Sequence, residues 1–99
     1  MYMRIISKRA LRVYWEQEPD SELELKAWHV EAKTAVWKTP ADVKARYATA
    51  SILKNGRIVF NIGGNKYRLI VRINYDFGII YIRFVGTHRE YDRIDAETI

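Results

Sequence analysis

The pattern of apolar and polar residues divides the chain into a helical first half and a strand-forming second half. In the first half, apolar side chains recur at the spacing of one helix face, as in Leu25, Trp28, Ala32 and Ala35. From Ile52 onward, apolar and polar residues alternate, which is typical of half-buried strands. Helices followed by consecutive strands predict one α+β domain over residues 1–99, with N-terminal helices packed on one face of an antiparallel sheet.

Serine and threonine residues mark the expected starts of four helices. Their side chains can accept hydrogen bonds from the first free N–H groups of a helix. Proline cannot continue a helix but fits its first turn. The predicted caps are Ser7 for a helix that runs toward Glu18 and stops at Pro19, Ser21 with Glu24, Thr39 before Pro40, and Thr87 with Glu90 for a short C-terminal helix.

Turn residues separate the predicted strands. A short strand over residues 3–6 precedes the helices, and Asn55-Gly56 is a typical two-residue hairpin turn. Strands are expected over residues 57–62, 65–75 and 79–85, joined by turns at Gly63-Gly64 and at residues 76–78. The sheet should therefore extend from about Ser51 to Gly86.

The strand register should keep apolar side chains on the helix side, because a slip of one residue would turn charged side chains inward. The predicted core pairs are Ile73 with Ile80, Val71 with Ile82, Leu69 with Phe84, and Phe60 with Tyr67. The predicted pairs on the other face are Arg68 with Val85, Ile70 with Arg83, Asn61 with Lys66, and Val59 with Arg68. Arg68 and Arg83 then become diagonal neighbours about 7–8 Å apart, close to the start of the last helix.

Positive charge is concentrated in the predicted sheet. The whole chain has a net charge of +5. Residues 51–87 contain six lysines and arginines against one aspartate, a net charge of +5, so the rest of the chain is balanced. A basic sheet face favours a polyanionic partner such as nucleic acid.

The sequence excludes several kinds of chemistry. It contains no cysteine, which rules out disulfides, thiolate metal sites and cysteine nucleophiles. Its two histidines lack the neighbouring ligand pattern of a metal site, so we expect neither a metal nor a cofactor. No apolar run is long enough to span a bilayer or to form a signal peptide, so we expect a cytoplasmic protein without a membrane partner.

Three residues could perform metal-independent RNA cleavage, which needs an acid, a base and a cation near the phosphate. His88 suits acid or base catalysis, and its expected place at a helix start favours bound anions. Arg68 could bind phosphate through its guanidinium fork. Tyr91, one helical turn after His88, could stack on a base or donate a proton. Each also has a plainer interpretation: a structural hydrogen bond for His88, solvation for Arg68, and packing for Tyr91.

Two segments resemble the signatures of HigB toxins in the RelE-like superfamily. They are residues 59–70 (VFNIGGNKYRLI) and residues 82–92 (IRFVGTHREYD). The helical half is similar as well, including Trp37-Lys38-Thr39-Pro40, so the resemblance covers nearly the whole chain. It implies a RelE-like fold and the toxin of a type II toxin–antitoxin pair, an endoribonuclease that cleaves mRNA. By motif position it implies Arg68 as the phosphate-stabilising residue, His88 as the acid or base, and Tyr91 as an assisting residue.

The resemblance also implies partners and RNA contacts. The expected partners are mRNA, the ribosome, and a HigA-like helix-turn-helix antitoxin whose complex with the toxin binds operator DNA. The expected RNA-binding residues are Asn61, Asn65, Lys66 and Arg83, together with the basic residues Lys54 and Arg57. Two other hypotheses stay open: a non-catalytic RNA- or ribosome-binding module that uses the same face, and an interaction subunit for an acidic protein.

Overall fold

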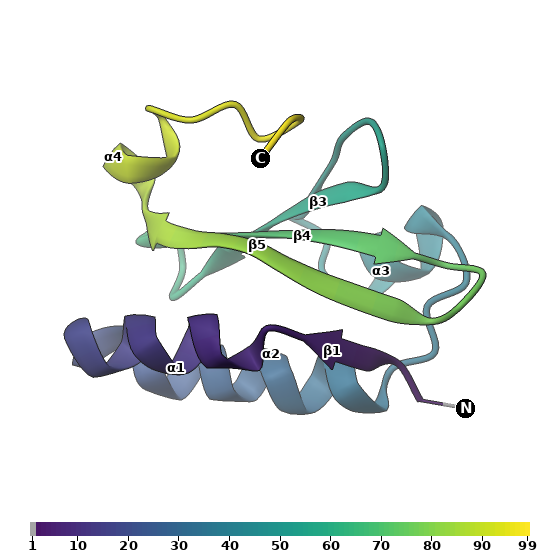
Figure 1. Cartoon of the computed structure of the whole chain (residues 1–99), viewed down its shortest axis with the longest axis horizontal. Helices are drawn as coiled ribbons and strands as arrows, with labels where there is room; N and C mark the ends of the chain where they lie inside the picture. Colours follow the sequence, from purple (N-terminus) through teal and green to yellow (C-terminus); the bar gives the residue numbers. More distant parts are fainter. Residues whose placement is uncertain (1) are drawn as a thin grey trace.

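A five-stranded mixed sheet with helices on one of its faces forms the framework of the molecule (Figure 1). The computed structural model describes residues 2–99. Across the sheet the strands lie in the order β1-β5-β4-β3-β2. The predicted α+β architecture is confirmed. In chain order the elements are β1 (Arg4–Ile6), α1 (Lys8–Gln17), the short 3-10 helix η1 (Pro19–Ser21), α2 (Glu22–Thr34), α3 (Pro40–Arg46), β2 (Ser51–Ile52), β3 (Arg57–Ile62), β4 (Tyr67–Asn74), β5 (Ile79–Thr87) and α4 (His88–Tyr91).

Besides the predicted antiparallel meander, the sheet contains one parallel strand, β1, at its edge. β1 pairs with β5 in parallel, with Arg4 opposite Ile79. Met3 is buried and Ile5 packs against the core, so the apolar side of β1 faces the helices. The predicted antiparallel pairing is confirmed for β2 to β5, and β1 alone departs from it. Alternation identified β1 as a strand but carries no information about the strand that it pairs with.

α1 and α2 begin where expected, but their predicted serine caps are wrong. Ser7 has a left-handed backbone with φ of 73°, and its side chain makes no capping bond. Ser21 is buried, and its hydroxyl donates to the main-chain oxygen of Glu18 at 2.7 Å, which leaves it no capping role in α2. Both serines shape tight connections between elements.

The threonine caps of α3 and α4 are confirmed. Thr39 accepts a hydrogen bond from the main-chain N–H of Asp42, and the Asp42 carboxylate accepts one in return. Thr87 and Glu90 form the same reciprocal box at α4. A helix as short as α4 has little stability of its own, so this box fixes it to the end of β5.

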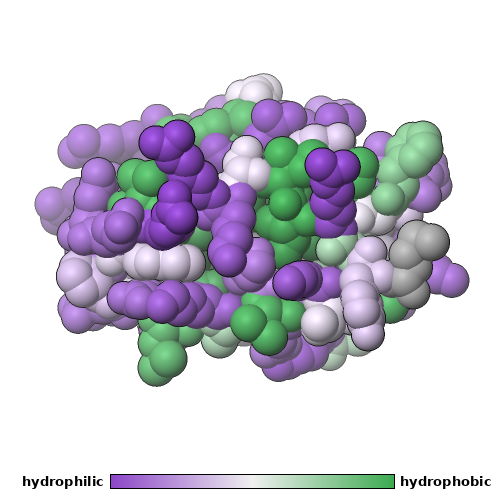
Figure 2. All heavy atoms as spheres, turned by 60° about the horizontal axis from the view of Figure 1, so that its bottom comes forward, coloured by the Kyte–Doolittle hydropathy of each residue, from purple (hydrophilic) through white to green (hydrophobic). Residues whose placement is uncertain are grey.

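Aromatic side chains fill the space between the helices and the sheet. Phe60 of β3 is fully buried, with ring centres 5.4 Å from Trp28 and 5.1 Å from Tyr47. Leu25 and Ala32, from the predicted apolar stripe of α2, are buried beside Trp28. The outer face of α1 and α2 is largely hydrophilic, with hydrophobic residues in separate patches (Figure 2). Within residues 2–99, no helix has both the length and the apolar character needed to cross a membrane.

The hairpin of β3 and β4 has a register two residues away from the predicted one. Asn61 lies opposite Arg68, and residues 63–66 form the connecting loop, so β4 begins at Tyr67 and not at residue 65. A shift of two residues leaves every side chain on its own face, and apolar alternation therefore does not distinguish the two registers. The predicted pairs of Asn61 with Lys66, Val59 with Arg68, and Phe60 with Tyr67 were wrong.

β5 contains a bulge at Arg83 that changes the pairing beyond it. The predicted pairs of Ile73 with Ile80 and of Val71 with Ile82 are confirmed. After the bulge, the pairs are Ile70 with Phe84, Leu69 with Val85, and Arg68 with Gly86. The extra residue moves Phe84 to the face opposite the helices and Val85 to the core face. The predicted pairs of Leu69 with Phe84, Ile70 with Arg83, and Arg68 with Val85 were therefore wrong, as was the diagonal contact of Arg68 with Arg83.

The C-terminal segment crosses the sheet face opposite the helices (Figure 1). The Nη2 atom of Arg57 donates to the main-chain oxygen of Ile99 at 2.8 Å and holds the segment there. The chain itself thus covers the middle of a face that the sequence pattern left open for a polyanion. The apolar cluster between this segment and the sheet comprises the buried Val59, Ile70 and Ala96, with Leu53, Phe84, Tyr91, Ile94 and Ile99 packed against it.

Candidate nucleic-acid interface

Three rows of side chains cross the sheet face opposite the helices. Because the C-terminal segment covers the middle row, the basic residues are divided between the two ends of the sheet. The end with Arg68 is the candidate site, since α4 and His88 join it there. The rows are Asn61, Arg68 and Gly86 near α4, then Val59, Ile70 and Phe84, then Arg57, Arg72 and Tyr81.

A loop and the start of a helix meet at this end of the sheet. The main-chain N–H of His88 donates to the main-chain oxygen of Lys66, in the loop before β4, at 3.2 Å. The Nη1 atom of Arg68 donates to the main-chain oxygens of Asn65 at 3.1 Å and Tyr67 at 3.3 Å. These bonds hold the loop, β4 and α4 together, and so bring Asn65, Lys66, Arg68 and His88 into one group.

Arg68 is far less exposed than a solvated sheet face would leave it. The residue is 8% exposed, and its guanidinium carbon lies 5.8 Å from the centre of the Tyr91 ring. Within residues 2–99, no carboxylate forms an ion pair with it. Burying a charge without an anionic partner is costly, so this guanidinium is well suited to an incoming phosphate. Its main-chain bonds use Nη1, which leaves the N–H groups of Nε and Nη2 as the remaining donors.

His88 is exposed and is oriented by one side-chain contact. Its Nδ1 lies 3.1 Å from Oδ2 of Asp92, one helical turn later. An aspartate acceptor favours the tautomer with the proton on Nδ1, which leaves Nε2 for a ligand. Sequence reasoning missed Asp92, although its spacing of four residues from His88 could have indicated the pair. The pair is no metal site: in the described part of the chain, no three His, Asp or Glu side chains gather as metal ligands.

The other predicted RNA-binding residues at this end have different surroundings. Lys66 is exposed, with its Nζ 3.7 Å from the Asp20 carboxylate, and such exposed pairs are weak. The Nδ2 atom of Asn61 donates to the main-chain oxygen of Thr49 at 3.1 Å, which leaves its Oδ1 for a ligand. Asn65 supplies a main-chain oxygen that positions Arg68. Lys66 is therefore the most accessible cation of the group.

Three predicted RNA-binding residues lie apart from this group. Lys54 and Arg57 are at the opposite end of the sheet, where Arg57 holds the C-terminal segment. Arg83 lies at the bulge, where it contacts the Tyr81 ring at 5.7 Å and lines a groove beside α1. The structure brings none of the three to Arg68 and His88.

Gly86 and Glu90 support the start of α4, and Tyr14 of α1 lies nearby with its ring against Tyr67 of β4. A Cβ atom at Gly86 would lie 2.6 Å from the Phe84 ring and 3.1 Å from the Glu90 carboxylate, so a larger residue beside Arg68 would have to displace these side chains. Glu90 completes the capping box of α4. Burial raises the pKa of the nearby Tyr14 hydroxyl to about 12, and the negative charge of Glu90 adds to the rise. The Thr87–Glu90 spacing predicted the capping box, whereas the close approach at Gly86 and the position of Tyr14 depend on tertiary contacts that no spacing in the sequence shows.

Comparisons with known proteins agree on one family. Residues 21–94 match the HigB toxin family, described as the RelE-like toxic component of a toxin-antitoxin system. An mRNA interferase toxin HigB of Escherichia coli K12 is 33% identical over 96 residues, which cover 95% of this chain and 92% of that protein. An mRNA interferase HigB of Shigella flexneri shows the same identity and coverage. Another, of Escherichia coli O6:H1, is 27% identical over 94 residues, covering 93% of this chain and 91% of that protein.

Proposed function

Because the chain belongs to the HigB family of RelE-like toxins, we propose that it is an endoribonuclease that cleaves mRNA and thereby inhibits translation and growth. It acts in the cytoplasm as the toxin of a toxin–antitoxin pair. The observation that carries the proposal is the convergence of Arg68 and His88. Both are bonded to adjacent residues of one loop, Arg68 to Asn65 and His88 to Lys66.

The proposed reaction is attack of a ribose 2′-hydroxyl on the adjacent phosphate, without a metal. Nε2 of His88 takes the proton from the 2′-hydroxyl, and Asp92 stabilises the imidazolium that forms. The 2′-oxygen bonds to phosphorus while the bond to the 5′-oxygen breaks, and solvent protonates the departing 5′-oxygen. The products are a 2′,3′-cyclic phosphate and a free 5′-hydroxyl.

Arg68 stabilises the charge that develops on the phosphate oxygens, through the N–H groups of Nε and Nη2. Removal of one such preorganised donor typically lowers a rate by about 10²–10³. Tyr91 assists by holding the guanidinium in place, and Lys66 and Asn61 bind the flanking RNA backbone. Lys54 and Arg57 are too far along the sheet to share this phosphate, and their proposed role is contact with a longer RNA.

The proposal extends to macromolecular partners. Cleavage takes place on the ribosome, whose RNA surface attracts a chain with a net charge of +5. A HigA-like helix-turn-helix antitoxin neutralises the toxin, and the complex binds operator DNA. Support for the antitoxin comes from the family, which is described as the toxic component of a toxin-antitoxin system.

A non-catalytic RNA- or ribosome-binding module is the second candidate, and the burial of Arg68 favours it. An arginine that bonds to the main chain of its own loop has a structural role whether or not RNA is present. Under this alternative, the basic residues bind RNA and His88 contributes only hydrogen bonds.

Substitution of His88 distinguishes the two candidates. The assay measures mRNA cleavage and RNA affinity with purified protein and ribosomes. We expect His88→Gln to lower the cleavage rate by about 10²–10⁴ with little change in RNA affinity. His29→Gln, on the half-buried side of α2, is the matched control and should cleave like wild type. Undiminished cleavage by folded His88→Gln would reject the assignment, and ribosome-bound wild-type protein that cuts nothing would favour the binding module.

A further inference from the structure

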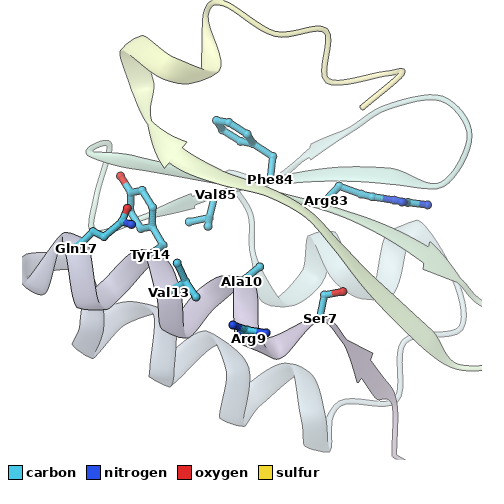
Figure 3. Close-up of a pocket in the computed structure, with 9 residues that line it drawn as sticks. All are labelled: Ser7, Arg9, Ala10, Val13, Tyr14, Gln17, Arg83, Phe84 and Val85. Atoms are coloured by element: carbon cyan, nitrogen blue, oxygen red, sulfur yellow. The ribbon is translucent and has the colours of Figure 1, made fainter.

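A groove runs between α1 and the second half of β5 (Figure 3). It has a volume of about 630 Å³. Ala10 and Val13 line it from α1 and are exposed, although both are apolar, and Val85 points toward them from β5. Val13 is 41% exposed. The groove therefore offers an apolar floor to solvent between α1 and β5.

The neighbouring edge of β5 has no strand partner. β1 pairs with β5 only over Ile79–Tyr81, because Ser7 then turns the chain into α1. Within residues 2–99, β4 is the only strand beside residues 82–87 of β5. An unpaired strand edge presents main-chain N–H and C=O groups that can pair with an added strand.

The rim of the groove is positively charged. Arg9 lies on the α1 side and Arg83 on the β5 side. In the described part of the chain, neither forms an ion pair with a carboxylate. The first turn of α1 contains no acidic residue that could offset them. The bulge that removed Arg83 from the RNA-facing group is what places it at this rim.

We propose that the groove binds an extended, acidic segment of the cognate antitoxin, which adds as a strand to the edge of β5. Its apolar side chains lie on Ala10, Val13 and Val85, and its carboxylates pair with Arg9 and Arg83. The inference rests on the proposed role as a toxin with an antitoxin, but not on the assignment of the cleavage residues. It gives this surface a partner that leaves Arg68 and His88 uncovered.

Two other occupants fit the groove less well. An RNA backbone could contact Arg9 and Arg83 but would leave the apolar side chains of Ala10, Val13 and Val85 against polar sugar and phosphate groups. A second copy of this chain would bring two positively charged rims together in a symmetric interface, where like charges repel. An acidic amphipathic peptide can pack apolar side chains on the floor of the groove and pair its carboxylates with the arginines of the rim.

Val13→Glu tests the proposal, with Val30→Glu as its matched control. Val30 is an exposed valine of α2, 62% exposed and outside the groove, so both variants make the same change on a helix surface. Titration calorimetry measures the affinity of each purified variant for the full-length cognate antitoxin. We expect Val13→Glu to weaken binding by about tenfold or more, as for a central interface residue, and Val30→Glu to bind like wild type. Ala10→Glu replaces Val13→Glu if thermal unfolding shows that the latter does not fold.

Three further readouts complete the test. Hydrogen exchange should show slower exchange of main-chain amides in residues 84–87 when the antitoxin binds. Free Val13→Glu should cleave mRNA at the wild-type rate, and loss of RNA binding would assign the groove to nucleic acid and overturn the proposal. If wild-type protein cleaves no RNA but Val13→Glu still loses the antitoxin, the proposed cleavage fails and the groove assignment stands. Wild-type affinity of folded Val13→Glu, or unprotected amides in residues 84–87, would overturn the assignment.

Discussion

Replacement of Tyr91 tests how the site holds its buried arginine. The ring centre lies 5.8 Å from the Arg68 guanidinium carbon, and the ring also packs against the apolar cluster under the C-terminal segment. Tyr91→Phe keeps the ring and removes only the hydroxyl, whereas Tyr91→Ala removes both. Because the ring itself contacts the guanidinium, we expect Tyr91→Phe to cleave RNA at close to the wild-type rate and Tyr91→Ala to cleave more slowly.

The size of the effect follows from the burial of Arg68. A cation–π contact contributes about 0.5–1 kcal/mol at exposed sites and about 2 kcal/mol when the pair is desolvated. Arg68 is 8% exposed, so the larger value applies. If the ring keeps the guanidinium in its reactive position, a loss of about 2 kcal/mol lowers the cleavage rate roughly 30-fold, since each 1.36 kcal/mol corresponds to a factor of ten. A proton-donating hydroxyl would instead cost about 10²–10⁴ in Tyr91→Phe.

Single-turnover cleavage of ribosome-bound mRNA measures both variants, with circular dichroism to confirm folding. The matched controls are Tyr81→Phe and Tyr81→Ala, because the Tyr81 ring contacts Arg83 at 5.7 Å but lies outside the candidate site. Both controls should cleave like wild type. A loss of about 100-fold or more in folded Tyr91→Phe would refute the reasoning and assign proton transfer to the hydroxyl.

Asp92→Asn should slow cleavage roughly fivefold, because it weakens a hydrogen bond of about 1 kcal/mol that orients the imidazole. Glu97→Gln, the same charge change five residues later in the chain, should not slow cleavage. ¹⁵N NMR of the imidazole should show a tautomer shift only in Asp92→Asn. Phe60→Ala should lower the free energy of unfolding in urea by about 3–5 kcal/mol, because it empties the centre of the aromatic core. Burial raises the pKa of Tyr14 and of Tyr47 to about 12, above the ordinary value of 10.0. The unfolded chain therefore releases these protons first, so stability should fall between pH of about 10 and 12, and a phenylalanine at either position should reduce that fall in urea titrations.

Features with a local physical cause were predictable from the sequence. Thr39 and Thr87 begin helices because their hydroxyls and the acidic residues three positions later form reciprocal bonds within one turn. The strand over residues 57–62 is confirmed because alternation and turn residues bound it on both sides. By contrast, Ser7 and Ser21 are of a residue type that often caps helices, but their side chains make no capping bond. The connections on either side of α1 determine their backbone geometry.

The arrangement of the candidate site was less predictable because it depends on pairing. Alternation determines which face of the sheet a side chain occupies, so it predicted the face of Arg68 correctly. It does not distinguish registers that differ by two residues, and it does not indicate the bulge at Arg83. The C-terminal segment carries no regular apolar spacing that would indicate its packing on Val59 and Ile70. The Tyr91 ring and the main-chain oxygens of Asn65 and Tyr67 surround the Arg68 guanidinium, and none of these contacts is indicated by alternation.

Mapping of RNA ends in cells tests the central claim, that the Arg68 end of the sheet cuts mRNA. Primer extension is performed after induction of wild-type protein, Arg68→Ala and the control Arg72→Ala, an exposed arginine farther along the same face of β4. Arg68→Lys, which keeps the charge but not the fork, replaces the alanine variant if that variant does not fold. We predict new 5′ ends within coding sequences for wild type and Arg72→Ala, and none for Arg68→Ala. The same 5′ ends at wild-type intensity with folded Arg68→Ala would contradict the account.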